Sequence, residues 1–238
     1  MPRKEGQARI LAKNDLKTIF LALKDTKHEM RNKAILMMAF KVGLRAKEIA
    51  SITLDDVLTA SGKLTYSSLK DSAKLMSSSN KTKCKSDKTK WESDKTKWES
   101  DHLRKTFTLR SAVTKGSKVD SAYLASKKVR EALLNYFPER VKMFQRGEVD
   151  NLFLTKNGKG FSPTTMSQLF MAMSKLSGIE FSSHSGRRHL TTELVRKGLH
   201  IFDIQAILRH KDISTTQLYY SKDERRLNDL MEDAQNGE

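Results

Sequence analysis

A long polar stretch, residues 71–101, interrupts this 238-residue chain. Ser, Lys, Thr, Asp and Glu make up nearly all of it, and the heptapeptide DKTKWES occurs twice in direct tandem, at 87–93 and 94–100. The seven residues at 80–86, NKTKCKS, look like a third copy that has diverged. A period of seven suggests a coiled coil, but each copy offers one apolar residue where a coiled coil needs two. We therefore expect a solvated or disordered insertion in a folded domain.

The repeat has two possible explanations. Replication slippage would produce a tandem copy that has no function. Alternatively, the lysines of the repeat contact DNA phosphates.

The charge balance indicates a polyanionic partner. The chain holds 45 Lys and Arg against 28 Asp and Glu, a formal net charge of +17, and such an excess usually serves nucleic acid or an anionic membrane surface. There is no apolar run of about 18 residues that could span a bilayer, and the N-terminus lacks the apolar core of a signal peptide. The only cysteine, Cys84, excludes an intrachain disulfide and a cysteine-based zinc site. We expect a cytoplasmic protein that binds nucleic acid.

The apolar spacing predicts a mostly α-helical domain with a small antiparallel β-sheet, an α+β class. A hairpin is predicted around Lys115-Gly116-Ser117, and an earlier strand over 63–68 with its entry near 51–58. Pro138 is expected to end one helix and Ser162-Pro163 to open the next. The predicted helices cover 16–23, 31–42, 46–52, 127–136, 163–176, 184–196, 203–209 and 215–221, with a charged tail helix from Asp223.

Three segments carry the candidate chemistry. They are FKVGLRAKEIASITLDDV at 40–57, HSGRRHLTTELVRKGL at 184–199 and IQAILRHKDISTTQLYYS at 204–221. In this order and spacing they resemble the catalytic segments of the tyrosine recombinase, or phage integrase, family. The resemblance covers about residues 12–225 apart from the insertion. It implies the DNA breaking-rejoining fold and a metal-independent DNA strand transferase without a cofactor.

Transfer of a phosphodiester to a protein nucleophile needs an attacking oxygen, cations at the non-bridging oxygens, a proton acceptor and a proton donor. The resemblance places Arg45 and Arg187 on the scissile phosphate, where a guanidinium can donate two parallel hydrogen bonds. Arg45 has an alternative as a surface arginine paired with Glu48. His184, three residues before Arg187 at a helix start, would accept or relay the tyrosine proton; otherwise it caps the helix.

The remaining roles follow from the resemblance in the same way. His210 would hydrogen-bond a non-bridging oxygen, with a helix C-cap as its alternative. Tyr219 would be the nucleophile, with Tyr220 as its alternative. Neighbouring helical side chains point about 100° apart, so only one of the two can face the phosphate. Lys115 in the hairpin would protonate the leaving 5′ oxygen, with Lys118 as its alternative.

Two positions depart from the family pattern. Arg188 stands where many members carry histidine, with His189 one residue later; we assign neither a catalytic role and expect Arg188 at most to contact DNA. Arg209 replaces the glycine of the usual Leu-Gly-His, so a positive φ there would strain the turn.

The implied domains are a basic arm (1–12), a catalytic domain (13–225) containing the insertion, and a tail (226–238). A separate DNA-gripping domain is usual ahead of the catalytic one, so the chain is expected to be a short member, a fragment or a degraded gene.

The implied function is site-specific recombination or integration through a 3′-phosphotyrosyl intermediate. The implied partners are double-stranded DNA, three further protomers in a tetrameric synapse, and accessory DNA-bending proteins, at the nucleoid and not at a membrane. Two alternatives stay open: relaxation of DNA like a type IB topoisomerase, and a DNA-binding regulator that has lost catalysis.

Overall fold

The computed structural model describes residues 11–12, 14–59, 92–95, 97, 102–109, 120–144, 150–210, 212–220, 228, 231–232 and 234–236. These ranges leave out the strand predicted over 63–68, Lys115, Lys118, most of the insertion and most of the tail helix predicted from Asp223. The described tail residues, 228, 231–232 and 234–236, are helical. None of the helices within the described ranges is long and apolar enough to cross a membrane.

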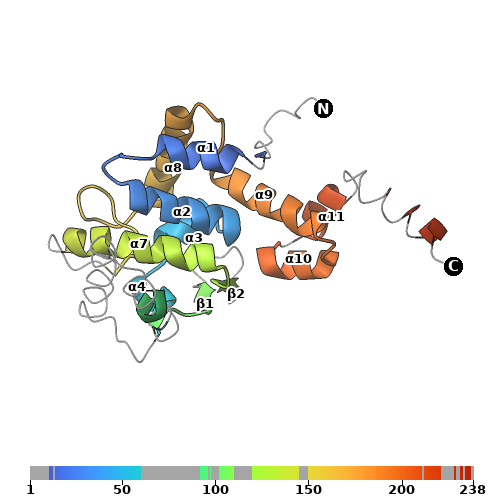
Figure 1. The fold of residues 1–238 in the computed structure, drawn as a ribbon, viewed down its shortest axis with the longest axis horizontal. Helices are drawn as coiled ribbons and strands as arrows, with labels where there is room; N and C mark the ends of the chain where they lie inside the picture. The colour runs from blue at the N-terminus through green and yellow to red at the C-terminus, as the bar shows by residue number, and fades with distance from the viewer. Residues whose placement is uncertain are drawn as a thin grey trace.

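Helix α2 (Glu29–Lys41) lies at the centre of the main body (Figure 1). Its residues 34–40 are all apolar and all buried, and a helix without a polar face has to be covered on several sides. α7 (Lys127–Phe144) and α9 (Ser183–Arg196) pack directly against it. α1 (Asp15–Ala22) packs on α8 (Pro163–Ser177), which also contacts α3 (Ala46–Ser51).

The sheet is small and antiparallel, as predicted. β1 (Thr106–Leu109) pairs with β2 (Asp120–Tyr123), with Leu109 opposite Asp120. The strand entry expected near 51–58 is wrong: residues 54–57 form the one-turn helix α4 (Leu54–Val57). Asp56 Oδ2 accepts from the Thr53 N–H at 2.7 Å and from the Thr53 hydroxyl at 2.8 Å, so a local cap turns the chain into a helix. The α+β class is confirmed.

Pro138 does not end its helix, contrary to the prediction. α7 continues to Phe144, although proline removes one backbone hydrogen bond. Packing outweighs this loss, because Tyr136 and Phe137 are fully buried before the proline and Arg140 after it. Arg140 Nη2 donates to the Asn151 carbonyl at 3.0 Å. The other helix ends agree with the prediction to within two residues.

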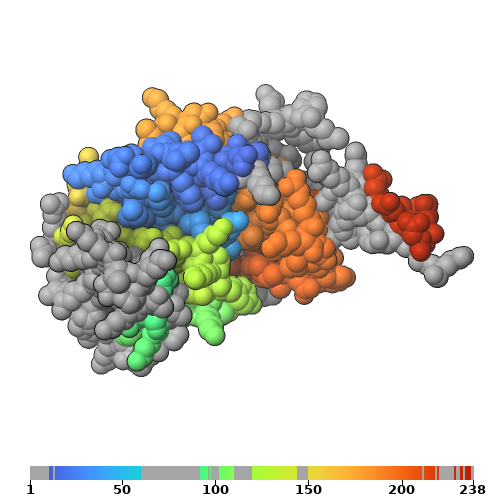
Figure 2. Space-filling model, in the orientation of Figure 1, coloured from blue at the N-terminus to red at the C-terminus, as the bar shows by residue number. Residues whose placement is uncertain are grey.

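Helices α9, α10 (Ile201–Leu208) and α11 (Ser214–Tyr220) form a C-terminal group beside the main body (Figures 1 and 2). Val195, Ile204 and Leu208 form its small core, and Tyr219 packs against them. α9 contacts α2, α10 and α11. α9 carries the second candidate segment, and it contacts both the helices of the third segment and the helix that leads into the first.

One described part of the insertion contacts the body. Residues 92–95 are helical, and Lys95 is buried, with its Nζ 3.0 Å from Glu131 Oε1 on α7. This lysine is therefore used by the fold, unlike the solvated lysine expected from composition.

Gly186 sets the distance between α9 and α2. A Cβ at this position would lie 2.7 Å from the Ala39 carbonyl oxygen, a backbone atom that cannot move aside alone. In an open helix an alanine would stabilise by about 1 kcal/mol relative to glycine. We expect Gly186→Ala instead to lower the free energy of unfolding by about 1–3 kcal/mol in urea titration. Arg196→Ala, exposed on the same helix, should change it by less than about 0.5 kcal/mol; equal values for both variants would contradict the close contact.

Candidate active site

Arg45 precedes α3 and shares a buried carboxylate. Its Nη1 lies 2.7 Å from Glu48 Oε1, and its backbone N–H donates to Glu48 Oε2 at 2.8 Å. The Arg45 side chain is 40% exposed, while that of Glu48 is 1% exposed. The Arg45–Glu48 pair expected for a surface arginine thus exists, but its carboxylate is buried and holds the half-exposed Arg45 guanidinium in place.

Arg187 points from α9 toward the same place. Its Nη1 donates to the Gly43 carbonyl at 2.9 Å, two residues before Arg45. Its Nε and Nη2 are buried and have no hydrogen-bond partner among the described residues. Burial and the nearby Arg45 charge lower the pKa of Arg187 to about 9, so the group stays cationic at neutral pH. A buried cation with unused donors suits an anion.

Arg209 is the third guanidinium here. Its Nη2 lies 3.4 Å from Glu48 Oε2. Burial opposes the charge on Glu48, but the Arg209 charge, the Arg45 N–H and the charges of Arg45 and Arg187 outweigh it and hold the pKa of the carboxyl below its ordinary value. One carboxylate therefore faces three arginines. We call Arg45, Arg187, Arg209, Glu48 and His210 the arginine cluster.

His210 follows the end of α10. Its Nδ1 lies 2.8 Å from the Thr216 hydroxyl, which is fully buried. Burial and the charges of Arg187, Arg45 and Arg209 lower the pKa of His210 to about 4, so the imidazole is neutral at pH 7. If Nδ1 accepts from Thr216, Nε2 carries the proton and can donate to a phosphate oxygen.

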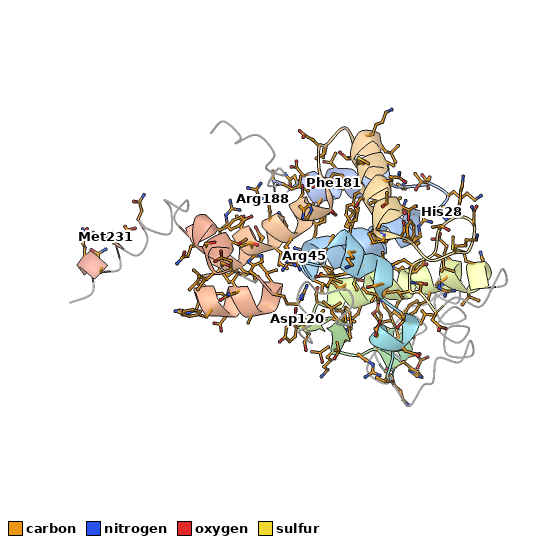
Figure 3. The ribbon with its side chains drawn as sticks, turned by 180° about the vertical axis from the view of Figure 1, so that it is seen from behind. His28, Arg45, Asp120, Phe181, Arg188 and Met231 are labelled. Carbon is orange, nitrogen blue, oxygen red and sulfur yellow. The ribbon has the colours of Figure 1, made fainter. Side chains whose placement is uncertain are left out.

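Tyr219 contacts α9 at Arg188, the residue that follows Arg187. Arg188 Nε donates to the Tyr219 hydroxyl at 3.1 Å, and the guanidinium carbon lies 5.9 Å from the ring centroid. Within the described residues, no hydrogen bond joins Tyr219 to the arginine cluster. Figure 3 labels Arg45 just before α3, Arg188 on α9 and Asp120 at the start of β2. Sequence reasoning gave Arg188 no part beyond DNA contact, and no spacing signal predicted its contact with Tyr219.

The other expected site residues are placed as follows. His184 is exposed in the first turn of α9, and in the described part of the chain its imidazole makes no hydrogen bond. His189 is buried, with Nδ1 3.3 Å from the Leu11 carbonyl, which fits the absence of a catalytic role. Lys115, Lys118 and the side chain of Tyr220 lie outside the described residues.

The fold matches solved structures of one class. The crystal structure of XerA recombinase superimposes with a TM-score of 0.64 at 20% identity, over 98% of this chain and 66% of that one. The fold is that of a tyrosine recombinase catalytic domain.

The family follows from the sequence. The model of the phage integrase family matches residues 9–226, and the chain belongs to this family. It is 23% identical to tyrosine recombinase XerD of Listeria monocytogenes serotype 4b (strain F2365), over 95% of this chain and 62% of that protein. It is 24% identical to transposase A of transposon Tn554 from Staphylococcus aureus (strain Mu50), over 90% and 48%. The chain thus spans about half to two thirds of these relatives.

The burial of His210 predicts a pH-dependent stability. In the unfolded chain a histidine titrates near 6.5, and in the fold its pKa is about 4. Between these values the unfolded state binds the extra proton, so stability falls as pH falls. We expect urea unfolding to show about 2 kcal/mol of loss from His210 between pH 7.5 and 5. His210→Gln should remove this part, while the exposed His200→Gln should keep it; identical pH profiles for wild type and His210→Gln would contradict the assignment.

Proposed function

We propose that this protein cleaves and rejoins double-stranded DNA at specific sites, with Tyr219 as the nucleophile. The observation that carries the proposal is the arginine cluster, in which three guanidinium groups surround one carboxylate and lie near the neutral His210 imidazole. Arg188, next to Arg187 on α9, donates to the Tyr219 hydroxyl. Such a site has surplus positive charge for a phosphodiester in its transition state.

In the proposed reaction the Tyr219 oxygen attacks the phosphorus and loses its proton, forming a 3′-phosphotyrosyl ester, and the released 5′ oxygen takes up a proton. Attack of a 5′ hydroxyl reverses the step, so the ester conserves the bond energy. Arg45 and Arg187 would bind the non-bridging oxygens and His210 would donate to one of them. His184 would receive the tyrosine proton, and Lys115 would protonate the leaving oxygen. Tyr219 has to exchange its contact with Arg188 for one with the phosphate.

We propose residues 13–225 as the catalytic domain, with 1–12 as a basic arm and 226–238 as a tail. The net charge of +17 supports DNA as the partner, with strong salt dependence. Four protomers in a synapse, accessory DNA-bending proteins and action at the nucleoid complete the proposal by analogy with the family.

A suicide substrate tests the reaction. A labelled duplex from the DNA flanking the gene, nicked next to the cleavage site, loses its 5′ hydroxyl end by diffusion and traps the covalent product. We expect a protein–DNA band on a denaturing gel in the presence of EDTA. A screen of flanking duplexes that yields tight binding but no band would support the regulator alternative.

Plasmid topology separates the second alternative. A type IB topoisomerase would relax supercoiled plasmids that carry no flanking sequence, whereas a recombinase needs its site. We expect relaxation and strand exchange only on plasmids that carry the flanking DNA. Equal relaxation of both plasmids would favour the topoisomerase.

A further inference from the structure

Arg209 occupies a backbone conformation that suits glycine. It is the C-cap of α10, with φ 55° and ψ 46°, in the left-handed region where a side chain costs about 1 kcal/mol. The usual family pattern has glycine at this place, so the strain comes with the arginine that replaces it. A residue that only ended the helix would be cheaper as glycine.

The side chain of Arg209 is held inside the molecule. It is 3% exposed. Nη1 donates to the carbonyls of Ser121 and Ile207, both at 3.2 Å, and Nη2 lies 3.5 Å from the Gly43 carbonyl. The guanidinium thus connects the end of α10 with β2 and with the segment that leads into Arg45.

Arg209 shares an acceptor with each of the two expected phosphate ligands. Its Nη2 and Arg187 Nη1 lie on the same Gly43 oxygen. It also shares the Glu48 carboxylate with Arg45, each on a different oxygen. Moving Arg209 therefore changes the setting of both other arginines, although its own nitrogens are enclosed by protein.

We propose that Arg209 is a positioning residue for DNA strand cleavage, a third guanidinium that fixes Glu48 and Gly43, thereby aims Arg45 and Arg187, and adds positive charge at the scissile phosphate. This rests on the proposed function. The charge count supports it, because the three guanidinium groups outnumber the two carboxylates that act on them, Glu48 and Asp120, and still repel one another. The phosphate in its transition state carries the charge that this arrangement stabilises.

A purely structural role predicts different data. Arg209 could serve only to hold β2 against α10, and its loss would then reduce stability and impair every substrate equally. A positioning role predicts a defect that depends on the charge of the phosphate. Arg209→Gly is a favourable variant because it relieves the strained φ while removing the cation.

The test compares two suicide substrates, one with the natural phosphodiester and one with an uncharged methylphosphonate at the cleavage site. On the phosphodiester we expect Arg209→Gly to lower the single-turnover cleavage rate about 10- to 100-fold, with DNA affinity near wild type. Tm is expected to fall, because the variant loses the buried ion pair and hydrogen bonds of Arg209, and this loss affects both substrates equally. On the methylphosphonate the defect should shrink below about fivefold, since less charge develops. Arg209→Lys should recover part of the rate, and exposed Arg196→Ala should match wild type. A rate for Arg209→Gly within threefold of wild type, or equal defects on both substrates, would overturn the proposal.

A measurement without DNA separates this proposal from the reaction itself. Burial lowers the pKa of His210 most, followed by the charges of Arg187, Arg45 and Arg209, so an NMR titration of His210 should shift slightly upward in Arg209→Gly and stay unchanged in Arg196→Ala. An unchanged His210 titration in Arg209→Gly would count against the charge coupling. A shifted titration together with no covalent band for wild type would reject the proposed reaction while supporting the coupling.

Discussion

Replacing Tyr219 by phenylalanine should abolish the covalent protein–DNA product, with a loss of at least about 1,000-fold in cleavage rate. The hydroxyl is the proposed attacking oxygen, and no other part of the side chain takes part in the chemistry. The ring packs against the core of α9 and α10, which phenylalanine preserves, so DNA binding and Tm should stay near wild type. The measurement is the covalent band from the suicide substrate.

Tyr220→Phe is the matched control, one residue along the same helix. It should keep the band at wild-type intensity. If the band is instead lost in Tyr220→Phe and kept in Tyr219→Phe, the nucleophile is the neighbouring residue and the assignment of Tyr219 is wrong.

Glu48→Gln should be among the most destabilising single substitutions in this chain, lowering the free energy of unfolding by about 3 kcal/mol. The glutamine fits the space and can still accept from the Arg45 N–H, but the substitution removes the carboxylate that pairs with both Arg45 and Arg209. The buried Arg187 and Arg209 would then face each other with Asp120 as the remaining negative charge that acts on both. Urea unfolding at pH 7.5 measures the loss.

Glu193→Gln is the control for this effect. Glu193 pairs with Arg196 at 3.5 Å, both partners being well exposed, and exposed pairs contribute little. Its stability should change by less than about 0.5 kcal/mol. An equally small change in the free energy of unfolding for Glu48→Gln would contradict the prediction, because it would mean that the arginines of the cluster do not need the carboxylate. Low ionic strength should enlarge the Glu48 effect, since salt screens the repulsion that remains.

Local signals predicted the helices well because caps and turns act over a few residues. Ser162 accepts from the Thr165 N–H at 3.1 Å and Gly178 ends the same helix at φ 67°, as their types suggest. The failure at Pro138 has a different cause. Pro138 disfavours a helix locally, yet the buried side chains on either side hold α7 together, and this packing involves residues distant in sequence.

At the site, too, local sequence patterns predicted some residues, while others depend on contacts between distant segments. The order of the three segments placed Arg45, Arg187 and His210, and the structure brings them together. Arg188 and Arg209 could not be placed, because their directions depend on where α11, β2 and Glu48 lie in three dimensions. A positive φ at Arg209 was foreseeable from the missing glycine, whereas the use of its side chain was not.

The adjacency of Arg187 and Arg188 on α9 has a genetic consequence. One faces the Gly43 carbonyl and the other the Tyr219 hydroxyl of the same chain. Under the proposed function, each protomer would then supply both its cations and its own attacking group. Two defective proteins, one lacking the Tyr219 hydroxyl and one lacking the Arg187 guanidinium, should therefore fail to rescue each other when mixed. Recovery of cleavage in that mixture would mean that α11 crosses to a neighbouring protomer on DNA.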